Sequence, residues 1–388
     1  MKIKSSSKNS TLNKNFIPVC EPILDGNEKK YVMAALDSGW ISSSGKYVVE
    51  FEKAFSDYCC VTHGIAASSG TAALHLSLLA LGISNNDEVI IPNFTMIASA
   101  FAVSYVGAKP VFVDAEKETW NIDPFKIEQK ITINTKAIMP VHIFGLPCNM
   151  DMINEIAEKY GLKVMEDAAE SHGAKYKGKI CGSLSDISGF SFFANKIVSI
   201  GEGGMVLTND DELANKCRYY RNLCFPMDKP RDYQHDEIGF NYRLSNLSAA
   251  IGLAQVEKVQ DYVDMRIRNN SLYRTFLEEV DGISHQIIDA SSESSYWMNG
   301  IVIDEKRFGR SRDVLVGELK KIGIETRLFF SGMHTQKSLA KYDNHDSDDY
   351  PVTQWLSTNG LYLPSASSLT EETIKYICDS IKNISISK

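Results

Sequence analysis

The chain has 388 residues, 44% of them hydrophobic, and its 41 basic and 49 acidic residues give a formal net charge of −8. This length and composition predict a large buried core, in one large domain with a smaller one beside it. A protein that binds nucleic acid normally carries a stripe of basic residues on its surface. In this chain, basic residues gather only near the N-terminus. No apolar run in the sequence reaches the length of a membrane span, so we expect neither a nucleic-acid nor a membrane partner.

Residues 1–15 are polar and lack the apolar core of a signal peptide, so we expect a flexible tail there. The eight cysteines are scattered, and no two of them form a CxxC pair. This pattern favours a reducing, cytoplasmic setting with buried thiols over a disulfide framework or a zinc site. We therefore expect no metal centre.

Between about residues 50 and 255, short apolar runs alternate with helical patterns, which is typical of an α/β domain with a mainly parallel sheet. Helices are expected at 71–82 and 150–161. The segments expected to be strands are 87–94, 109–115, 135–144, 162–169, 187–193 and 203–209.

A long helix is expected through residues 246–280, followed by a smaller α+β region with strands at 296–303 and 324–330. We place the domain boundary inside that helix. The predicted division is a large α/β domain at 16–265 and a small C-terminal domain at 266–388.

The first candidate site precedes the helix at 71–82, in the run SSGT at residues 68–71. A helix N-terminus offers free N–H groups and the positive end of the helix dipole, which suits a phosphate, and the hydroxyls of Ser69 and Thr71 can add hydrogen bonds. An ordinary helix cap is the alternative interpretation. The residues expected on the apolar face of this helix are Leu74, Leu78 and Leu81.

Acidic residues end the strand expected at 162–169. The carboxyl ends of strands in an open parallel sheet border the ligand crevice. A buried carboxylate at Asp167 can hold a protonated pyridine nitrogen by a charge-assisted hydrogen bond. A capping or ion-paired aspartate is the alternative.

Lys196 follows an aromatic strand and precedes the Gly-rich turn at 201–204. A desolvated lysine there has a lowered pKa, and a neutral amine is what Schiff-base chemistry requires. Ser191 is placed to bind the same phosphate as Thr71. A lysine on a surface loop is the alternative.

These three motifs, in this order, resemble the DegT/DnrJ/EryC1/StrS family of sugar aminotransferases over about residues 16–380. Further segments that match the family are 38–41, 51–52, 239–243, 296–298 and 325–327 with His334. The resemblance implies a fold-type I, pyridoxal-phosphate-dependent transferase, with a mixed, mainly parallel seven-stranded sheet and a small α+β C-terminal domain. It also implies a homodimer with active sites shared between subunits.

The resemblance implies two catalytic residues: Lys196 matches the family's Schiff-base lysine, and Asp167 matches the partner of the pyridine nitrogen. Besides these two, the residues expected to bind the cofactor are Glu170 near the ring's 3-oxygen, Ser69, Gly70, Thr71 and Ser191 at the phosphate, Met96 at the ring face, and Asn241, which reaches the phosphate from the partner subunit. The residues expected near the substrate are Trp40, Ser42, Arg327 and His334.

Two segments depart from the family's pattern. Met96 stands where an aromatic residue often stacks on the ring, and a thioether can also pack there. Residues 328–331 (LFFS) replace a common Pro-aromatic-Tyr-Pro run, which weakens the substrate inference at Arg327 and His334. His172 is expected to pack beside the ring rather than to carry protons.

The implied reaction moves an amino group from glutamate to a keto sugar. Residues 192–196 and 201–205 look most like GDP-perosamine synthases, which act on GDP-4-keto-6-deoxymannose, so a nucleotide-linked 4-keto-6-deoxy sugar for lipopolysaccharide or another surface glycan is expected. Residues 222–236 belong to a loop that varies with substrate, so dTDP- or UDP-linked sugars and an 8-oxo octulosonate remain alternatives. A sugar dehydratase or a cofactor-free regulatory protein is disfavoured, because Lys196 and Asp167 are both present.

Overall fold

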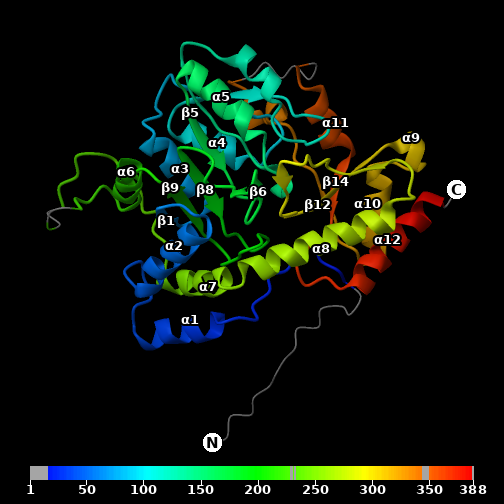
Figure 1. Ribbon diagram of the computed structural model, residues 1–388, viewed down its shortest axis with the longest axis horizontal. Coiled ribbons are helices and arrows are strands. Elements are labelled where there is room, and N and C mark those ends of the chain that lie inside the picture. Colours follow the sequence, from blue (N-terminus) through cyan, green and yellow to red (C-terminus); the bar gives the residue numbers. More distant parts are fainter. Residues whose placement is uncertain (1–15, 228–229, 231–232, 343–348, 387–388) are drawn as a thin grey trace, which may run out of the picture.

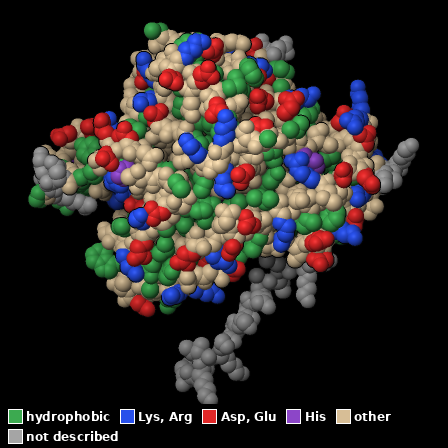
Figure 2. Space-filling model, in the orientation of Figure 1, with side chains coloured by type: hydrophobic (Ala, Val, Ile, Leu, Met, Phe, Trp, Pro, Cys, Tyr) green, Lys and Arg blue, Asp and Glu red, His purple; other side chains and the backbone are tan. Residues whose placement is uncertain are grey.

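The computed structural model describes residues 16–227, 230, 233–342 and 349–386. The tail predicted at 1–15 lies outside the described residues, as does part of the loop at 222–236. Among the described helices, none is long and apolar enough to cross a membrane. Figure 2 shows acidic and basic side chains interspersed over the face in view.

A seven-stranded sheet forms the centre of the large domain, in the order β1-β9-β8-β5-β4-β2-β3. Only β9 runs antiparallel to its neighbours, so the predicted mixed, mainly parallel sheet is confirmed. The six predicted strands all form, and β1 is the one that the sequence patterns missed. The strands are β1 (His63–Ala67), β2 (Glu88–Pro92), β3 (Lys109–Val113), β4 (Thr135–Ile138), β5 (Lys163–Asp167), β8 (Ile187–Ser191) and β9 (Gly204–Thr208).

Helices cover both faces of this sheet (Figure 1). The helices of this domain are α1 (Glu28–Asp37), α2 (Lys46–Tyr58), α3 (Gly70–Ala80), α4 (Ala98–Tyr105), α5 (Met150–Tyr160), α6 (Asp211–Arg221) and α7 (Asn246–Val256), and α1 packs on α7 rather than on the sheet. The amphipathic face predicted for α3 is wrong, because nearly every side chain from Ala72 to Ala80 is buried. The reason is that α3 lies between the sheet and the outer helices α4 and α6.

A second, four-stranded sheet forms the small domain, in the order β10-β12-β14-β13, and all its strand pairs are antiparallel. Its strands are β10 (Ile283–Ser284), β12 (Asn299–Ile303), β13 (Arg327–Leu328) and β14 (Gly360–Leu363). The strand predicted at 324–330 is therefore much shorter. The helices of this region are α8 (Val259–Leu277), α9 (Glu305–Phe308), α10 (Arg312–Lys321), α11 (Pro351–Asn359) and α12 (Glu371–Ile386).

Short elements complete the architecture. A three-stranded sheet contains β6 (Lys175–Tyr176), β7 (Lys179–Ile180) and β11 (Ser292–Glu293), and the 3₁₀ helices are η1 (Pro124–Lys126), η2 (Glu128–Lys130), η3 (Ile143–Gly145), η4 (Met333–Thr335) and η5 (Lys337–Leu339). The predicted domain boundary at 265/266 falls inside α8 and stays a prediction. Ile17 bridges Ile324 of the small domain.

The single helix predicted at 246–280 is wrong, because α7 and α8 are separate helices. The backbone leaves helical geometry at Lys258, with φ −119° and ψ 10°. The flanking side chains are anchored to the N-terminal segment: Lys258 Nζ lies 2.6 Å from Asp25 Oδ1, and Glu257 accepts a 2.7 Å bond from Asn27. These long-range contacts stabilise the break, and they leave no local sequence signal.

The parallel strands and β1 run in the same direction, so their carboxyl ends meet at one edge of the sheet. Gly70 follows β1 and opens α3, whereas Asp167 ends β5 and Ser191 ends β8. The fold therefore gathers the three predicted motifs at that edge.

Candidate active site

The loop between β8 and β9 carries Lys196 and is pinned at its base. Phe192 N donates to Gly203 O at 2.9 Å, and Ile200 N donates to Phe192 O at 2.9 Å. Gly201 has φ +85°, a conformation that side chains with a Cβ rarely adopt. The loop therefore turns back sharply at Gly201, which keeps the backbone around Lys196 close to the edge of the sheet.

The amine of Lys196 is buried against an indole ring. Its Nζ lies 3.6 Å from the ring centroid of Trp297, a cation–π distance. Trp297 Nε1 donates to Asn195 O at 2.8 Å, which fixes the ring. Burial lowers the pKa of Lys196, and the carboxylates of Glu170 and Asp167 oppose that shift.

Asp167 is only 4% exposed at the end of β5. Its Oδ2 accepts a 2.7 Å bond from Ser99 Oγ, and its Oδ1 accepts a 3.2 Å bond from Ala169 N. Burial raises the pKa of Asp167, although these hydrogen bonds and the charge of Lys196 oppose the shift. A desolvated carboxylate of this kind is stabilised by a cationic partner.

Glu170 is buried nearby, and its Oε2 accepts a 2.8 Å bond from Phe144 N. Phe144 adopts the left-handed backbone conformation, with φ 56°, which turns its amide toward the carboxylate. Burial raises the pKa of Glu170 to about 7, with Lys196 opposing. Glu170 can therefore hold or release a proton near neutral pH.

Glu170→Gln is expected to change how the stability of the cofactor-free chain depends on pH. The Glu170 carboxyl binds its proton more tightly in the folded state than in the unfolded state. Protonated Glu170 therefore increases the free energy of unfolding of the wild type at low pH, and this increase disappears as pH rises from 4.5 to about 7. Each unit of raised pKa corresponds to about 1.4 kcal/mol. Urea unfolding across this range should show a steeper loss for wild type than for the variant, and parallel curves would contradict the assignment.

His172 lies in an aromatic stack behind the lysine. Its ring lies nearly parallel to those of Phe190, at 5.5 Å and 7°, and Phe192, at 5.3 Å and 13°. Burial lowers the pKa of His172 to about 3, so the ring is neutral. This environment fits packing rather than proton transfer.

The N-terminus of α3 forms a narrow cradle. Ser69 is its N-cap and accepts a 3.1 Å bond from Ala72 N. A Cβ at Gly70 would lie 2.6 Å from Ser191 Cβ, and a Cβ at Gly204 would lie 2.2 Å from Ser69 O. The ordinary cap therefore exists, and the first amide groups of the helix lie close to the Ser191 side chain.

Gly70→Ala is expected to weaken phosphate binding by about 10-fold or more, because the added methyl group forces α3 away from Ser191. Gly317→Ala is the matched control, since a Cβ there meets nothing within 4 Å. Equilibrium dialysis of pyridoxal phosphate would measure the effect. Equal affinities of the two variants would rule out the cradle as the phosphate site.

Met96 and Ser331, which represent the two departures from the family pattern, line one hollow of 400 Å³. Met96 is 48% exposed, and its Sδ accepts a 3.0 Å bond from Ala98 N. A half-exposed thioether at the carboxyl end of β2 can reach a planar ligand.

Arg327 lies on the exposed β13, opposite Tyr362, and its Nη2 lies 3.1 Å from Glu325 Oε1. Burial, followed by the charge of Glu170, raises the pKa of Tyr362 to about 12, and Arg327 opposes this shift. The charges of Arg327 and Glu170 therefore shift the pKa of the same tyrosine in opposite directions.

His334 is buried in this chain, with 1% of its surface exposed. Its backbone N donates to Asn93 Oδ1 at 2.9 Å, and its Nδ1 lies 2.7 Å from Asn93 Nδ2. Its ring packs on Tyr350 at 4.8 Å.

Trp40, Ser42 and Asn241 are exposed, and none of the contacts described above joins them to Lys196. The carbonyls of Trp40 and Ser42 accept bonds from Asn246 at 2.6 and 2.9 Å. Next to Asn241, the carbonyl of Tyr242 accepts from Ser68 N at 2.8 Å. These side chains are free to face another molecule.

Sequence patterns missed several residues that position the site. Ser99 and Phe144 hold the two carboxylates, and Trp297 covers the lysine. Arg266 is fully buried and donates to Trp297 O at 3.0 Å, Ser367 Oγ at 2.8 Å and Cys20 Sγ at 3.3 Å. Among these residues, the sequence pointed only to Trp297, through the match of Tyr296-Trp297-Met298 to the family.

A buried group of potential metal ligands, His142, Glu166 and Cys181, lies behind β5. Glu166 accepts bonds from His142 Nε2 at 3.0 Å, Gly182 N at 2.6 Å and Leu184 N at 2.8 Å. These three donors satisfy the Glu166 carboxylate, so the group stabilises the strand that ends in Asp167.

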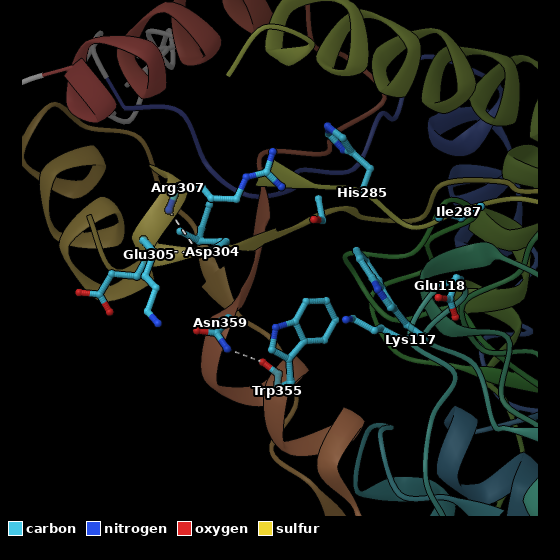
Figure 3. A pocket seen from close by; sticks show the side chains of 13 residues that line it. Lys117, Glu118, His285, Ile287, Asp304, Glu305, Arg307, Trp355 and Asn359 are labelled. Atoms are coloured by element: carbon cyan, nitrogen blue, oxygen red, sulfur yellow. Dashed lines mark hydrogen bonds between the residues drawn. The ribbon is translucent and has the colours of Figure 1, made fainter. Parts of the chain in front are cut away.

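A separate hollow of 630 Å³ is lined by neither Lys196 nor Asp167. Figure 3 shows Lys117 directed at the Trp355 ring there, with Nζ 5.5 Å from the centroid. The candidate chemistry therefore lies at the carboxyl edge of the large sheet and not in this hollow.

The family model described as the DegT/DnrJ/EryC1/StrS aminotransferase family matches residues 22–382. The chain belongs to this family. A GDP-perosamine synthase of Caulobacter vibrioides is 44% identical over 369 residues, covering 95% of this chain and 98% of that protein. One from Vibrio cholerae is 40% identical over 370 residues, covering 95% of this chain and 98% of that protein.

A solved structure of DesV from S. venezuelae, in complex with a ketimine intermediate, superposes with a TM-score of 0.87 at 30% identity, covering 93% of this chain and 95% of that one. The chain is thus a pyridoxal-phosphate-dependent sugar aminotransferase with the fold-type I architecture. Its residues fit the cofactor: a buried amine, a desolvated carboxylate and a helix N-terminus with a close-packed glycine converge at one sheet edge.

Proposed function

We propose that this enzyme transfers the amino group of glutamate to the keto carbon of a GDP-linked 4-keto-6-deoxy sugar, for lipopolysaccharide or another surface glycan. The relatives named GDP-perosamine synthase, at 40% and 44% identity over nearly the whole chain, support this substrate. The observation that carries the chemistry is the buried amine of Lys196 beside Asp167 and Glu170.

Lys196 would hold the cofactor. When bound, pyridoxal phosphate draws electrons from the carbon that bears the amino group. Burial lowers the pKa of Lys196, which favours its neutral form; Nζ would then take the proton from the α-carbon of glutamate and later give one to the sugar carbon that receives the amine. Asp167 would accept the hydrogen bond of the ring nitrogen, and Glu170 would lie near the ring's 3-oxygen.

Other side chains would fix the ligands in place. The phosphate would be held by Ser69, Gly70, Thr71 and Ser191, with Asn241 reaching over from the partner subunit of a homodimer. Met96 would pack on the ring, and the sugar would lie among Trp40, Ser42, Arg327 and His334. We place the enzyme in the cytoplasm and keep the domain division at 265/266.

A mass-spectrometric assay with ¹⁵N-labelled glutamate and a panel of keto sugars tests this proposal. We expect the label to appear in the product of GDP-4-keto-6-deoxymannose with the highest kcat/KM. Preference for a dTDP- or UDP-linked sugar, or for an 8-oxo octulosonate, would overturn the substrate. No labelled sugar from any member of the panel would overturn the proposed reaction.

A further inference from the structure

Two hydroxyl side chains lie behind the carboxylate of Asp167. Thr95 follows β2, and Ser99 lies in the first turn of α4. Ser99 Oγ donates to Asp167 Oδ2 at 2.7 Å, and it lies 3.2 Å from Thr95 Oγ1. Both hydroxyl residues are buried. The three side chains therefore form a continuous row of hydrogen bonds that is shielded from bulk solvent and ends at the carboxylate.

The directions of these hydrogen bonds depend on the charge of Asp167. A hydroxyl has one hydrogen to donate, whereas an ionised carboxylate can only accept. When Ser99 donates its hydrogen to Asp167, its oxygen is left as an acceptor for the Thr95 hydroxyl. The second carboxylate oxygen, Oδ1, accepts from Ala169 N at 3.2 Å. A proton on either oxygen would compete with one of these donors, so the arrangement favours the ionised form of Asp167.

Burial acts on the same carboxyl group in the opposite direction. It raises the pKa of Asp167, and the bond from Ser99 is the largest of the effects that lower this pKa. The bond from Ala169 N and the charge of Lys196 have smaller effects in the same direction. Removal of the Ser99 hydroxyl would therefore leave the buried carboxyl with less to oppose its protonation.

Ser99 also contacts the segment that we expect to lie against the face of the cofactor ring. Its backbone N donates to Met96 O at 3.3 Å, and its Oγ lies 3.4 Å from the same oxygen. The backbone of Asp167 is held separately, because its N donates to Pro140 O at 2.9 Å. The Ser99 side chain thus connects the Asp167 side chain of β5 to the segment that carries Met96.

We infer that Ser99, supported by Thr95, is a positioning residue that keeps the Asp167 carboxylate ionised and in place to pair with the nitrogen of the cofactor ring. Ser99 acts through the carboxylate oxygen that it binds, so it need not touch the cofactor. The inference rests on the role proposed above for Asp167, whichever sugar is aminated. Because a hydrogen bond between two charged groups is stronger than a neutral one, loss of Ser99 should weaken the binding of a ligand that has the ring nitrogen and spare one that lacks it.

Equilibrium dialysis of the purified, cofactor-free enzyme tests this inference with two ligands. They are pyridoxal phosphate and its 1-deaza analogue, in which a carbon atom replaces the ring nitrogen. Ser99→Ala should weaken the binding of pyridoxal phosphate by about 10-fold or more and change that of the analogue by less than about twofold. Thr95→Val removes the supporting hydroxyl with little change in shape, and it should weaken pyridoxal phosphate binding in the same selective way, by about threefold.

Ser77→Ala is the matched control for the loss of a buried hydroxyl. Ser77 is also a completely buried serine in a helix, but its hydroxyl donates to the backbone oxygen of Ala73 at 2.9 Å. This variant should keep both affinities within about twofold of wild type. Circular dichroism verifies the folding of every variant.

Equal weakening of both ligands in Ser99→Ala would assign Ser99 a purely structural role and overturn the inference, and so would an unchanged affinity for pyridoxal phosphate. Asp167→Asn separates this failure from a failure of the role proposed for Asp167. If Asp167→Asn selectively loses pyridoxal phosphate affinity and Ser99→Ala does not, only the role of Ser99 is wrong. If Asp167→Asn binds both ligands as the wild type does, the proposed pairing with the ring nitrogen is wrong as well.

Discussion

Lys196→Ala is expected to lower kcat for amino transfer by about 10⁴-fold or more, because it removes both the attachment point of the cofactor and the group that moves the proton. The buried amine contacts the Trp297 ring, and shortening the side chain leaves the backbone bonds of its loop in place. The measurement is single-turnover formation of 2-oxoglutarate from glutamate, with circular dichroism to verify folding.

The matched control for this variant is Lys179→Ala, which removes an exposed lysine of β7 from the same domain. It should keep wild-type turnover. If Lys196→Ala stays within about 10-fold of wild type, the assignment of Lys196 is wrong and another amine must carry the chemistry.

Asp167→Asn is expected to lower kcat by about 10²–10³-fold, because the amide preserves the shape of the carboxylate but cannot stabilise a positive charge on the ring nitrogen. An amide oxygen can still accept the bond from Ser99. The expected change is therefore in catalysis and in cofactor affinity, both measurable by steady-state assay and dialysis, and not in folding.

Asp210→Asn serves as the control for loss of one carboxylate. Asp210 caps α6 by accepting bonds from Glu212 N and Leu213 N, and asparagine caps a helix about as well. Its turnover should equal that of wild type. Wild-type rates in Asp167→Asn would remove the counter-charge role of Asp167.

The sequence predicted the order of the strands along the chain because each is a short apolar run bounded by turns. It also located the candidate groups, since Asp167 and Ser191 end strands and Gly70 opens a helix. Because parallel strands end at one edge of a sheet, the sequence alone predicts that these positions lie close together.

The sequence patterns did not predict which distant segments contact each other. Ser99 bonds to Asp167 across 68 residues, and Arg266 bonds to Trp297 from another element. The break between α7 and α8 is stabilised by Asp25, which lies 233 residues from Lys258. The burial of α3 on all sides depends on the helices that cover it, and its own composition does not reveal them.

The most direct test of the central claim is peptide mapping after borohydride reduction of the purified, cofactor-loaded enzyme. Reduction fixes a cofactor that is bound to a lysine amine, and mass spectrometry then locates it. We predict that the added mass lies on the peptide containing Lys196 and is absent from Lys196→Arg. Label on a different lysine, or on none, would contradict the account.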